Sequence, residues 1–298
     1  METLFLSPLT IIIIASIVGF FMAYGIGAND VANAMGTSVG SKALTLKQAI
    51  IIAAIFEFLG AYFGGGEVTS TIRKGIVDPT IYEDANKFII GMLSSLLAAG
   101  TWLIIASRRG WPVSTTHSIV GAIIGFVSIS KGVSYVSWGT VGGIASSWVT
   151  SPVIAGLLAF LIYLSAKKSI LDSANPGGRA VKIIPIYSFY VAFIISLVIA
   201  RKGLKNMGLE ISDSDIYMFS SIFGIIAAAI TYTLLRQNFS KIKENGIESA
   251  FAILMVVSAC AMAFAHGSND VANAIGPLAA IVSTVNSNGV IDTSSPVQ

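Results

Sequence analysis

Two copies of one polar segment carry the residues of this chain that are best suited to binding an ion. The first copy is Gly27–Gly36, GANDVANAMG, and the second is Gly267–Gly276, GSNDVANAIG. Each copy follows an apolar run and holds one aspartate and two asparagines among small residues. Carboxylate and amide oxygens are ligands of hard cations, and a carboxylate inside a membrane helix costs about 3 kcal/mol even on lenient insertion scales. The repeated segment therefore predicts a paired ion or substrate site.

The spacing within each copy places its polar groups near one face of a helix. Asp30 and Asn33 are three positions apart, and Asn29 and Asn33 are four apart, so their side chains are neighbours on a helix. The flanking glycines, Gly25, Gly27 and Gly36, allow the helix to break and to free backbone carbonyls as further ligands. Hydrogen bonding between helices is the alternative role for such a pattern, and two matching copies favour the site.

The segment Gly110–Ser118, GWPVSTTHS, is the second signal and predicts the start of a helix. Pro112 suits the first helical turn, and three hydroxyl side chains follow it, those of Ser114, Thr115 and Thr116. Free N–H groups, the positive end of the helix dipole and these hydroxyls together make an anion site without a fixed positive charge. The alternative is that the hydroxyls bond only to their own backbone.

Three other ionisable residues lie in apolar surroundings. Glu57, in the run IFEFL, is either a protonated packing group or a cation ligand or gate charge. His117 either relays protons or couples the two sites, or it only packs. His266 is predicted to be a packing histidine.

Composition places the chain in a membrane. Hydrophobic residues make up 54% and charged residues 11%, and the mean hydropathy is +0.81, whereas about 25% of the residues in a soluble domain are charged. The net charge of +3 is spread over loops and gives no sign of nucleic-acid binding. Cys260 is the single cysteine, which excludes a disulfide within the chain and a thiolate metal cluster.

Eight apolar runs predict an all-α polytopic membrane protein, because lipid leaves no backbone group unpaired. Seven spans between the two polar copies would make them face opposite ways, as in an inverted repeat. A re-entrant hairpin at 113–129 would reverse that parity. Short, interrupted segments in corresponding positions indicate a site at the membrane midplane, built from broken helices or re-entrant hairpins. The runs are 8–28, 49–63, 88–106, 113–129, 138–164, 183–200, 218–235 and 250–265.

These residues resemble the inorganic phosphate transporter (PiT) family, which moves phosphate with sodium or protons. The resemblance covers the whole chain. It rests on GANDVANA (27–34), IFE (55–57), TIRKG (71–75), PVSTTH (112–117) and FAHGSNDVANAIGP (264–277). No second PVSTTH follows Gly276, although the family pattern has one, so we expect the chain to end inside a second repeat.

The resemblance implies a secondary active transporter that imports inorganic phosphate with sodium by alternating access. Sodium would be a transported ion and not a prosthetic group. The implied location is the cell (inner) membrane, and the implied assembly is a homodimer. A first repeat with connecting helices would cover 1–236, a polar loop 237–248 and the start of a second inverted repeat 249–298. The implied sodium ligands are Asn29, Asp30, Asn269 and Asp270; the implied phosphate ligands are Ser114, Thr115, Thr116, Asn33 and Asn273; Glu57 and His117 would gate or couple.

Other functions stay open at this point. A proton-coupled permease for phosphate, metal phosphate or sulfate is the related alternative. An intramembrane enzyme using Asp30, Asp270 and His117 would be a different class, but no HExxH or serine nucleophile motif accompanies them. A channel would lack uphill accumulation.

Overall fold

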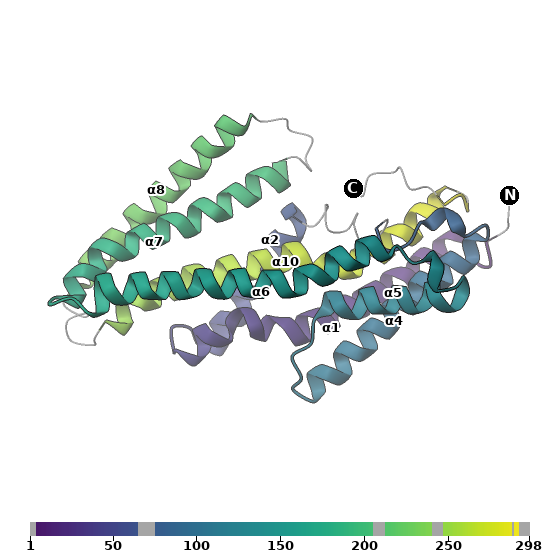
Figure 1. Ribbon diagram of the computed structural model, residues 1–298, viewed down its shortest axis with the longest axis horizontal. Coiled ribbons are helices and arrows are strands. Elements are labelled where there is room, and N and C mark those ends of the chain that lie inside the picture. Colours follow the sequence, from purple (N-terminus) through teal and green to yellow (C-terminus); the bar gives the residue numbers. More distant parts are fainter. Residues whose placement is uncertain (1–3, 65–74, 205–211, 240–246, 288, 292–298) are drawn as a thin grey trace. The chain divides into compact units, whose positions relative to one another are not determined.

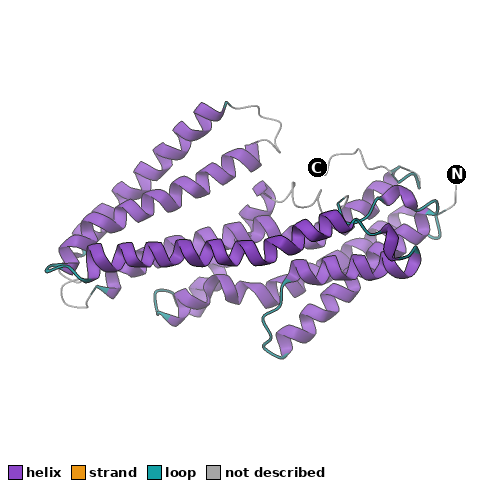
Figure 2. Ribbon diagram, in the orientation of Figure 1, coloured by secondary structure: helices purple, strands orange, loops and turns teal. Residues whose placement is uncertain are grey.

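The computed structural model describes residues 4–64, 75–204, 212–239, 247–287 and 289–291, and nearly all of them are helical (Figure 2). Among these residues there is no strand, and one isolated β-bridge joins Val77 to Val136. The prediction of an all-α protein is confirmed. The basic pair Arg73 and Lys74 of the TIRKG motif lies outside the described residues, as do positions 240–246 of the polar loop.

Seven of the described helices are long and apolar enough to cross a membrane. The remaining α-helix, α5, has 16 residues, so it is about 24 Å long against a hydrocarbon core of about 30 Å. The run at 113–129 therefore forms a helix shorter than the hydrocarbon core is thick. That it enters the membrane as a re-entrant hairpin stays a prediction. In chain order (Figure 1) the helices are α1 (Pro8–Gly40), α2 (Leu46–Gly64), α4 (Ala85–Arg108), α5 (Thr115–Ser130), α6 (Trp138–Ala166), α7 (Pro176–Val198), α8 (Asp213–Gln237) and α10 (Glu248–Asn286).

Both copies of the polar segment lie inside unbroken helices, which corrects the expectation of a break at the glycines. α1 continues through the first copy, and α10 continues through the second. The nearby Gly25 instead permits close packing, since a Cβ there would lie 3.1 Å from Leu103 of α4. An interruption of helical hydrogen bonding comes from Pro277, which has no N–H to donate to the backbone carbonyl of Asn273.

α4 and α5 form an antiparallel pair. The ring of Phe126 covers Gly91, where an added Cβ would come within 1.9 Å of the ring. Tyr82, just before α4, stacks on Phe126 with 5.3 Å between centroids, and its hydroxyl lies 2.6 Å from Ser130 Oγ. These contacts hold the end of α5 beside the start of α4. The connection at 109–114 consequently lies at the opposite end of the pair.

The described chain divides into two compact units. The first unit comprises residues up to 33, 59–143 and 266 onward, and the second comprises 34–58 and 144–265. In the first unit, α10 packs on α1 at Gly19, where a Cβ would lie 3.2 Å from Leu278. All the residues implied as sodium or phosphate ligands by the resemblance lie in the first unit. The repeat boundaries predicted at 236 and 249 stay a prediction.

The second unit is built on α7 and α8, with the first part of α10. Phe189 of α7 lies against Gly224 of α8, where a Cβ would come within 2.7 Å of the ring. A small hydrophobic core lies in this unit, near the start of α7, the end of α8 and the start of α10. It contains Ile170, Ala180, Val181, Ile184, Leu235 and Ala250.

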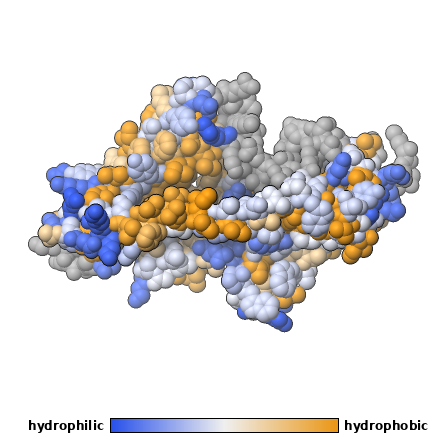
Figure 3. Space-filling model, in the orientation of Figure 1, coloured by the Kyte–Doolittle hydropathy of each residue, from blue (hydrophilic) through white to orange (hydrophobic). Residues whose placement is uncertain are grey.

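Large apolar side chains are exposed along the helices. Figure 3 shows hydrophobic residues over much of α6, where exposed side chains include Val153, Leu157 and Leu161. A soluble monomer rarely exposes so long an apolar surface to water, whereas lipid tails would cover it without a penalty. Together with the seven long apolar helices, this makes the chain a multi-pass membrane protein.

Candidate functional site: carboxylates, amides and hydroxyls of the first unit

The site lies where α1, α10 and the beginning of α5 meet inside the first unit. Three polar side chains at its centre are almost inaccessible: Asp30 is 6% exposed, Thr115 is 2% exposed and Asn273 is 0% exposed. Buried polar groups require partners, and the contacts between these elements supply them. The structure thus brings together both copies of the polar segment and the serine–threonine segment, which the sequence placed far apart.

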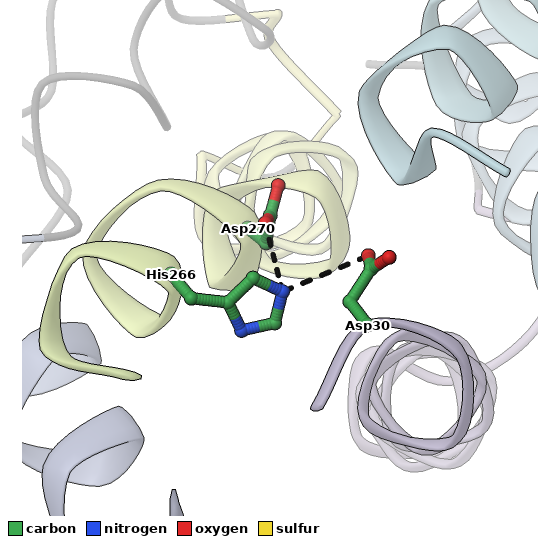
Figure 4. A group of neighbouring side chains, drawn as sticks. All are labelled: Asp30, His266 and Asp270. Atoms are coloured by element: carbon green, nitrogen blue, oxygen red, sulfur yellow. Dashed lines mark ion pairs between the residues drawn. The ribbon is translucent and has the colours of Figure 1, made fainter. Parts of the chain in front are cut away.

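His266 lies between the two repeated aspartates (Figure 4). Its Nε2 atom is 3.0 Å from Asp270 Oδ2 and 3.6 Å from Asp30 Oδ2. One ligand atom from each of the three residues lies within 4.8 Å of the others, a grouping that could hold a metal ion. The predicted packing role of His266 did not include this arrangement. The signal was available, because His266 and Asp270 stand four positions apart on one helix face.

The second polar copy is hydrogen-bonded to the start of α5. Thr115 Oγ1 donates to Asp270 Oδ1 at 3.1 Å. Asn273 Nδ2 lies within hydrogen-bond distance of Thr115 Oγ1 at 3.1 Å and of Thr116 Oγ1 at 3.2 Å. The same amide nitrogen is 3.1 Å from Asp270 Oδ1. A predicted cation ligand and the predicted phosphate hydroxyls therefore belong to one hydrogen-bonded group.

The first polar copy is hydrogen-bonded to the connection that precedes α5. Asn29 Nδ2 donates to Ser107 Oγ and to the carbonyl oxygen of Trp111, both at 3.1 Å. Asn29 Oδ1 accepts the backbone N–H of Val113 at 3.2 Å. Ser107 in turn donates to the carbonyl of Leu103 at 2.7 Å. The contacts of Ser107 and Trp111 with α1 were not predicted, because nothing local to these residues indicates a partner there.

Each copy also contains the same internal hydrogen bond. Asn33 Nδ2 donates to Asp30 Oδ1 at 3.3 Å, and Asn273 Nδ2 donates to Asp270 Oδ1 at 3.1 Å. The prediction that the aspartate and the second asparagine share a helix face is therefore confirmed. The environments differ, however, since Asn33 and Asn269 are exposed while their counterparts, Asn273 and Asn29, are buried.

Ser114 is the N-cap of α5. Its Oγ accepts the backbone N–H of His117 at 3.2 Å, so the helix begins at Thr115 and Pro112 precedes the cap. This corrects the expectation that Pro112 lies in the first turn. The N–H groups of Thr115 and Thr116 have no partner inside the helix, so the positive end of α5 points where the hydroxyls gather. A pocket outside this turn is lined by Trp102, Val113, Ser114, His117 and Ser118.

Three further predicted residues are not among the buried polar side chains: Asn269, Glu57 and His117, which is exposed on α5. Asn269 is exposed on α10. Glu57 is half-buried on α2 and belongs to the second unit. The role of Asn269 as sodium ligand and the roles of Glu57 and His117 in gating or coupling stay predictions.

The chemistry available at this site is binding, since it offers oxygen ligands for a cation beside hydroxyl and N–H donors for an anion. In a chain whose described residues include seven helices long enough to cross a membrane, such a buried group is typical of a membrane transport protein.

Comparison with known proteins agrees with a role in membrane transport and identifies the family. The model of the phosphate transporter family matches residues 26–298, and the chain belongs to that family, whose members transport and are not enzymes. A putative phosphate permease of Haemophilus influenzae is 50% identical over 284 residues, 93% of this chain and 68% of the relative. The chloroplastic inorganic phosphate transporter 2-1 of Arabidopsis thaliana is 41% identical, over 89% of this chain and 49% of the relative.

A solved structure supports the same fold. It is described as the sodium-dependent phosphate transporter, and it superposes with a TM-score of 0.85 at 38% identity. The match covers 97% of this chain and 70% of that structure. The all-α membrane architecture and the family membership predicted from the sequence are thereby confirmed.

Proposed function

We propose that this protein imports inorganic phosphate together with sodium across the cell membrane, as a secondary transporter that works by alternating access. The observation that carries the proposal is the contact of Thr115 Oγ1 with Asp270 Oδ1 at 3.1 Å. It puts the anion donors of α5 directly beside a carboxylate of the repeated segment.

This contact gives coupling an electrostatic basis. A phosphate held by Thr115 would bring its negative charge next to Asp270. Two like unit charges about 4 Å apart repel by about 4 kcal/mol at an effective dielectric constant of 20. A cation on Asp270 removes that repulsion, and the phosphate in turn offsets the charge of the cation. Each ligand therefore favours the binding of the other, as symport requires.

Oxygen ligands support sodium as the cation. Asp30 and Asp270 supply carboxylates, and the Oδ1 atom of Asn273 is a buried acceptor without a hydrogen-bond partner among the described residues. The backbone carbonyl of Asn273, which Pro277 leaves without its helical donor, is a further oxygen. The similar solved structure is described as sodium-dependent. The hydroxyls of Thr115 and Thr116 and the free N–H groups of their turn are the proposed phosphate donors.

Uptake of radiolabelled phosphate into proteoliposomes tests this function. An inward sodium gradient should drive accumulation above equilibrium, whereas an inward proton gradient at equal sodium on both sides should not. Asp30→Asn and Asp270→Asn should each raise the sodium concentration for half-maximal uptake, and the exposed Glu83→Gln variant should behave as wild type. Accumulation driven by protons alone would favour a proton-coupled permease, and uptake that never exceeds equilibrium would indicate a channel.

A further inference from the structure

The hydroxyl of Thr115 can donate one hydrogen bond, and in this structure Asp270 accepts it. A threonine hydroxyl offers a single O–H donor and two acceptor lone pairs. The Thr115 hydroxyl donates to Asp270 Oδ1, and the two oxygens are 3.1 Å apart. Thr115 is 2% exposed, so water has little access to the hydroxyl. While this bond exists, Thr115 cannot donate to a phosphate oxygen.

Asn273 restricts the direction of that hydrogen bond. Its Nδ2 atom lies 3.1 Å from Thr115 Oγ1, 3.2 Å from Thr116 Oγ1 and 3.1 Å from Asp270 Oδ1, so its two hydrogens are shared among three acceptors. Because an amide nitrogen donates and does not accept, the Thr115 hydroxyl cannot donate to Asn273 Nδ2, and the acceptor that it meets is Asp270. Asn273 is fully buried within the α10 helix, so its side chain has little freedom to release Thr115.

Asp270, the acceptor of this hydrogen bond, also belongs with Asp30 and His266 to the group that could hold a metal ion. Its Oδ2 atom lies 3.0 Å from His266 Nε2, while its Oδ1 atom accepts from Thr115. A cation bound by this carboxylate would weaken it as a hydrogen-bond acceptor and repel the positive hydrogen of the Thr115 hydroxyl. The cation and the hydroxyl therefore compete for one carboxylate.

We propose that Thr115 is the residue that couples the two ligands. Without a cation its hydroxyl is held by Asp270, and binding of a cation at Asp270 releases the hydroxyl to donate to phosphate. This inference rests on the proposed function and adds the atoms through which coupling acts. Coupling then has two contributions, a general one from charge and a specific one from the Thr115–Asp270 hydrogen bond.

Comparing a variant of each aspartate separates the contribution of charge from that of the Thr115–Asp270 hydrogen bond. Asp270→Asn and Asp30→Asn each remove one negative charge from the same site, but the described structure has a hydrogen bond from Thr115 to Asp270 alone. We would measure binding of inorganic phosphate to the purified full chain in choline chloride, with no sodium present. Asp270→Asn should bind phosphate about tenfold more tightly than Asp30→Asn, because a hydrogen bond to a charged acceptor is replaced by a weaker neutral one. Equal affinities of the two variants would overturn the inference and leave charge alone as the cause.

The reciprocal experiment changes Thr115 and measures sodium binding. Thr115→Val removes the competing hydroxyl, so sodium binding in phosphate-free buffer should tighten about three- to tenfold, while phosphate binding is lost. Thr115→Ser keeps the hydroxyl and should match wild type in both measurements. Unchanged or weaker sodium binding by a Thr115→Val protein that elutes as wild type would contradict the inference.

These results are distinguishable from failure of the proposed function. If sodium gradients do not drive phosphate uptake by the wild type, the proposed function fails. The comparison of Asp270→Asn with Asp30→Asn in sodium-free buffer still decides whether Asp270 restrains Thr115, whichever cation drives transport.

Discussion

Asn29 and Val113 are 84 positions apart in the chain, yet the side-chain oxygen of Asn29 accepts the backbone N–H of Val113 at 3.2 Å. The amide nitrogen of Asn29 also donates to the carbonyl of Trp111 and to Ser107 Oγ. One asparagine of the first polar copy therefore holds the segment that leads into the N-cap of α5. We infer that Asn29 positions the phosphate donors, in place of the direct role in sodium binding that the resemblance implied.

Substitution of Asn29 by aspartate separates these two roles. Asn29→Asp keeps an acceptor for Val113 but loses the donor to Ser107 and Trp111, so the connection before α5 should loosen. We expect phosphate affinity to fall by about tenfold, in line with the loss of two neutral hydrogen bonds. Sodium affinity should not improve. Asn286→Asp, at the exposed end of α10, is the control. Tighter sodium binding by Asn29→Asp, with phosphate affinity intact, would restore Asn29 as a cation ligand.

Ser114 should act through its capping bond. Ser114→Ala removes the acceptor for the His117 N–H and should lower the free energy of unfolding by about 1 kcal/mol, with a parallel loss of phosphate affinity as the first turn of α5 frays. Ser114→Asn supplies another capping side chain and should restore most of both. Thermal unfolding and phosphate binding are measured on the same samples. Equal values for the alanine and asparagine variants would show that capping is not the role of Ser114.

His266 should matter most when no cation is bound. His266→Ala leaves Asp30 and Asp270 without the imidazole that lies 3.0 Å from one and 3.6 Å from the other. Repulsion between the carboxylates should then lower the melting temperature in choline chloride, and sodium chloride at the same ionic strength should recover much of the difference. The exposed His117→Ala serves as a control for loss of an imidazole. A melting temperature that responds equally to the two salts would contradict this account.

Glu57 offers a prediction about the second unit. Glu57→Gln keeps the shape of the side chain and removes its charge, and we expect the variant to insert normally but to transport phosphate poorly. The reason is that a carboxylate on an apolar membrane helix is seldom kept for packing alone. Expression, chromatographic profile and initial uptake rate would be compared with wild type across a range of pH. Normal uptake throughout that range would favour a packing role.

Much of the site chemistry was predictable because it depends on local sequence. Composition predicted membrane helices, since about 20 apolar residues suffice to cross lipid whatever they contact. The repeated NDVAN pattern predicted Asp30 and Asp270 as candidate ligands, and its spacing predicted that Asn33 and Asn273 share a helix face with them. The hydroxyl cluster at 114–116 predicted a helix start for a similar reason, because capping involves only near neighbours in the chain.

Tertiary structure decided which polar groups meet, and that changed several roles. Gly25 serves close packing of α1 against α4, and α1 continues unbroken past it, neither of which local sequence reveals. Asn29 and Asn269 occupy the same position in their copies, yet only Asn29 is buried, against a connection about 80 residues further along the chain. The bond of Thr115 to Asp270 spans 155 positions. Sequence alone determined the types of ligand in this protein, whereas their pairing depended on contacts between distant helices, which no local pattern encodes.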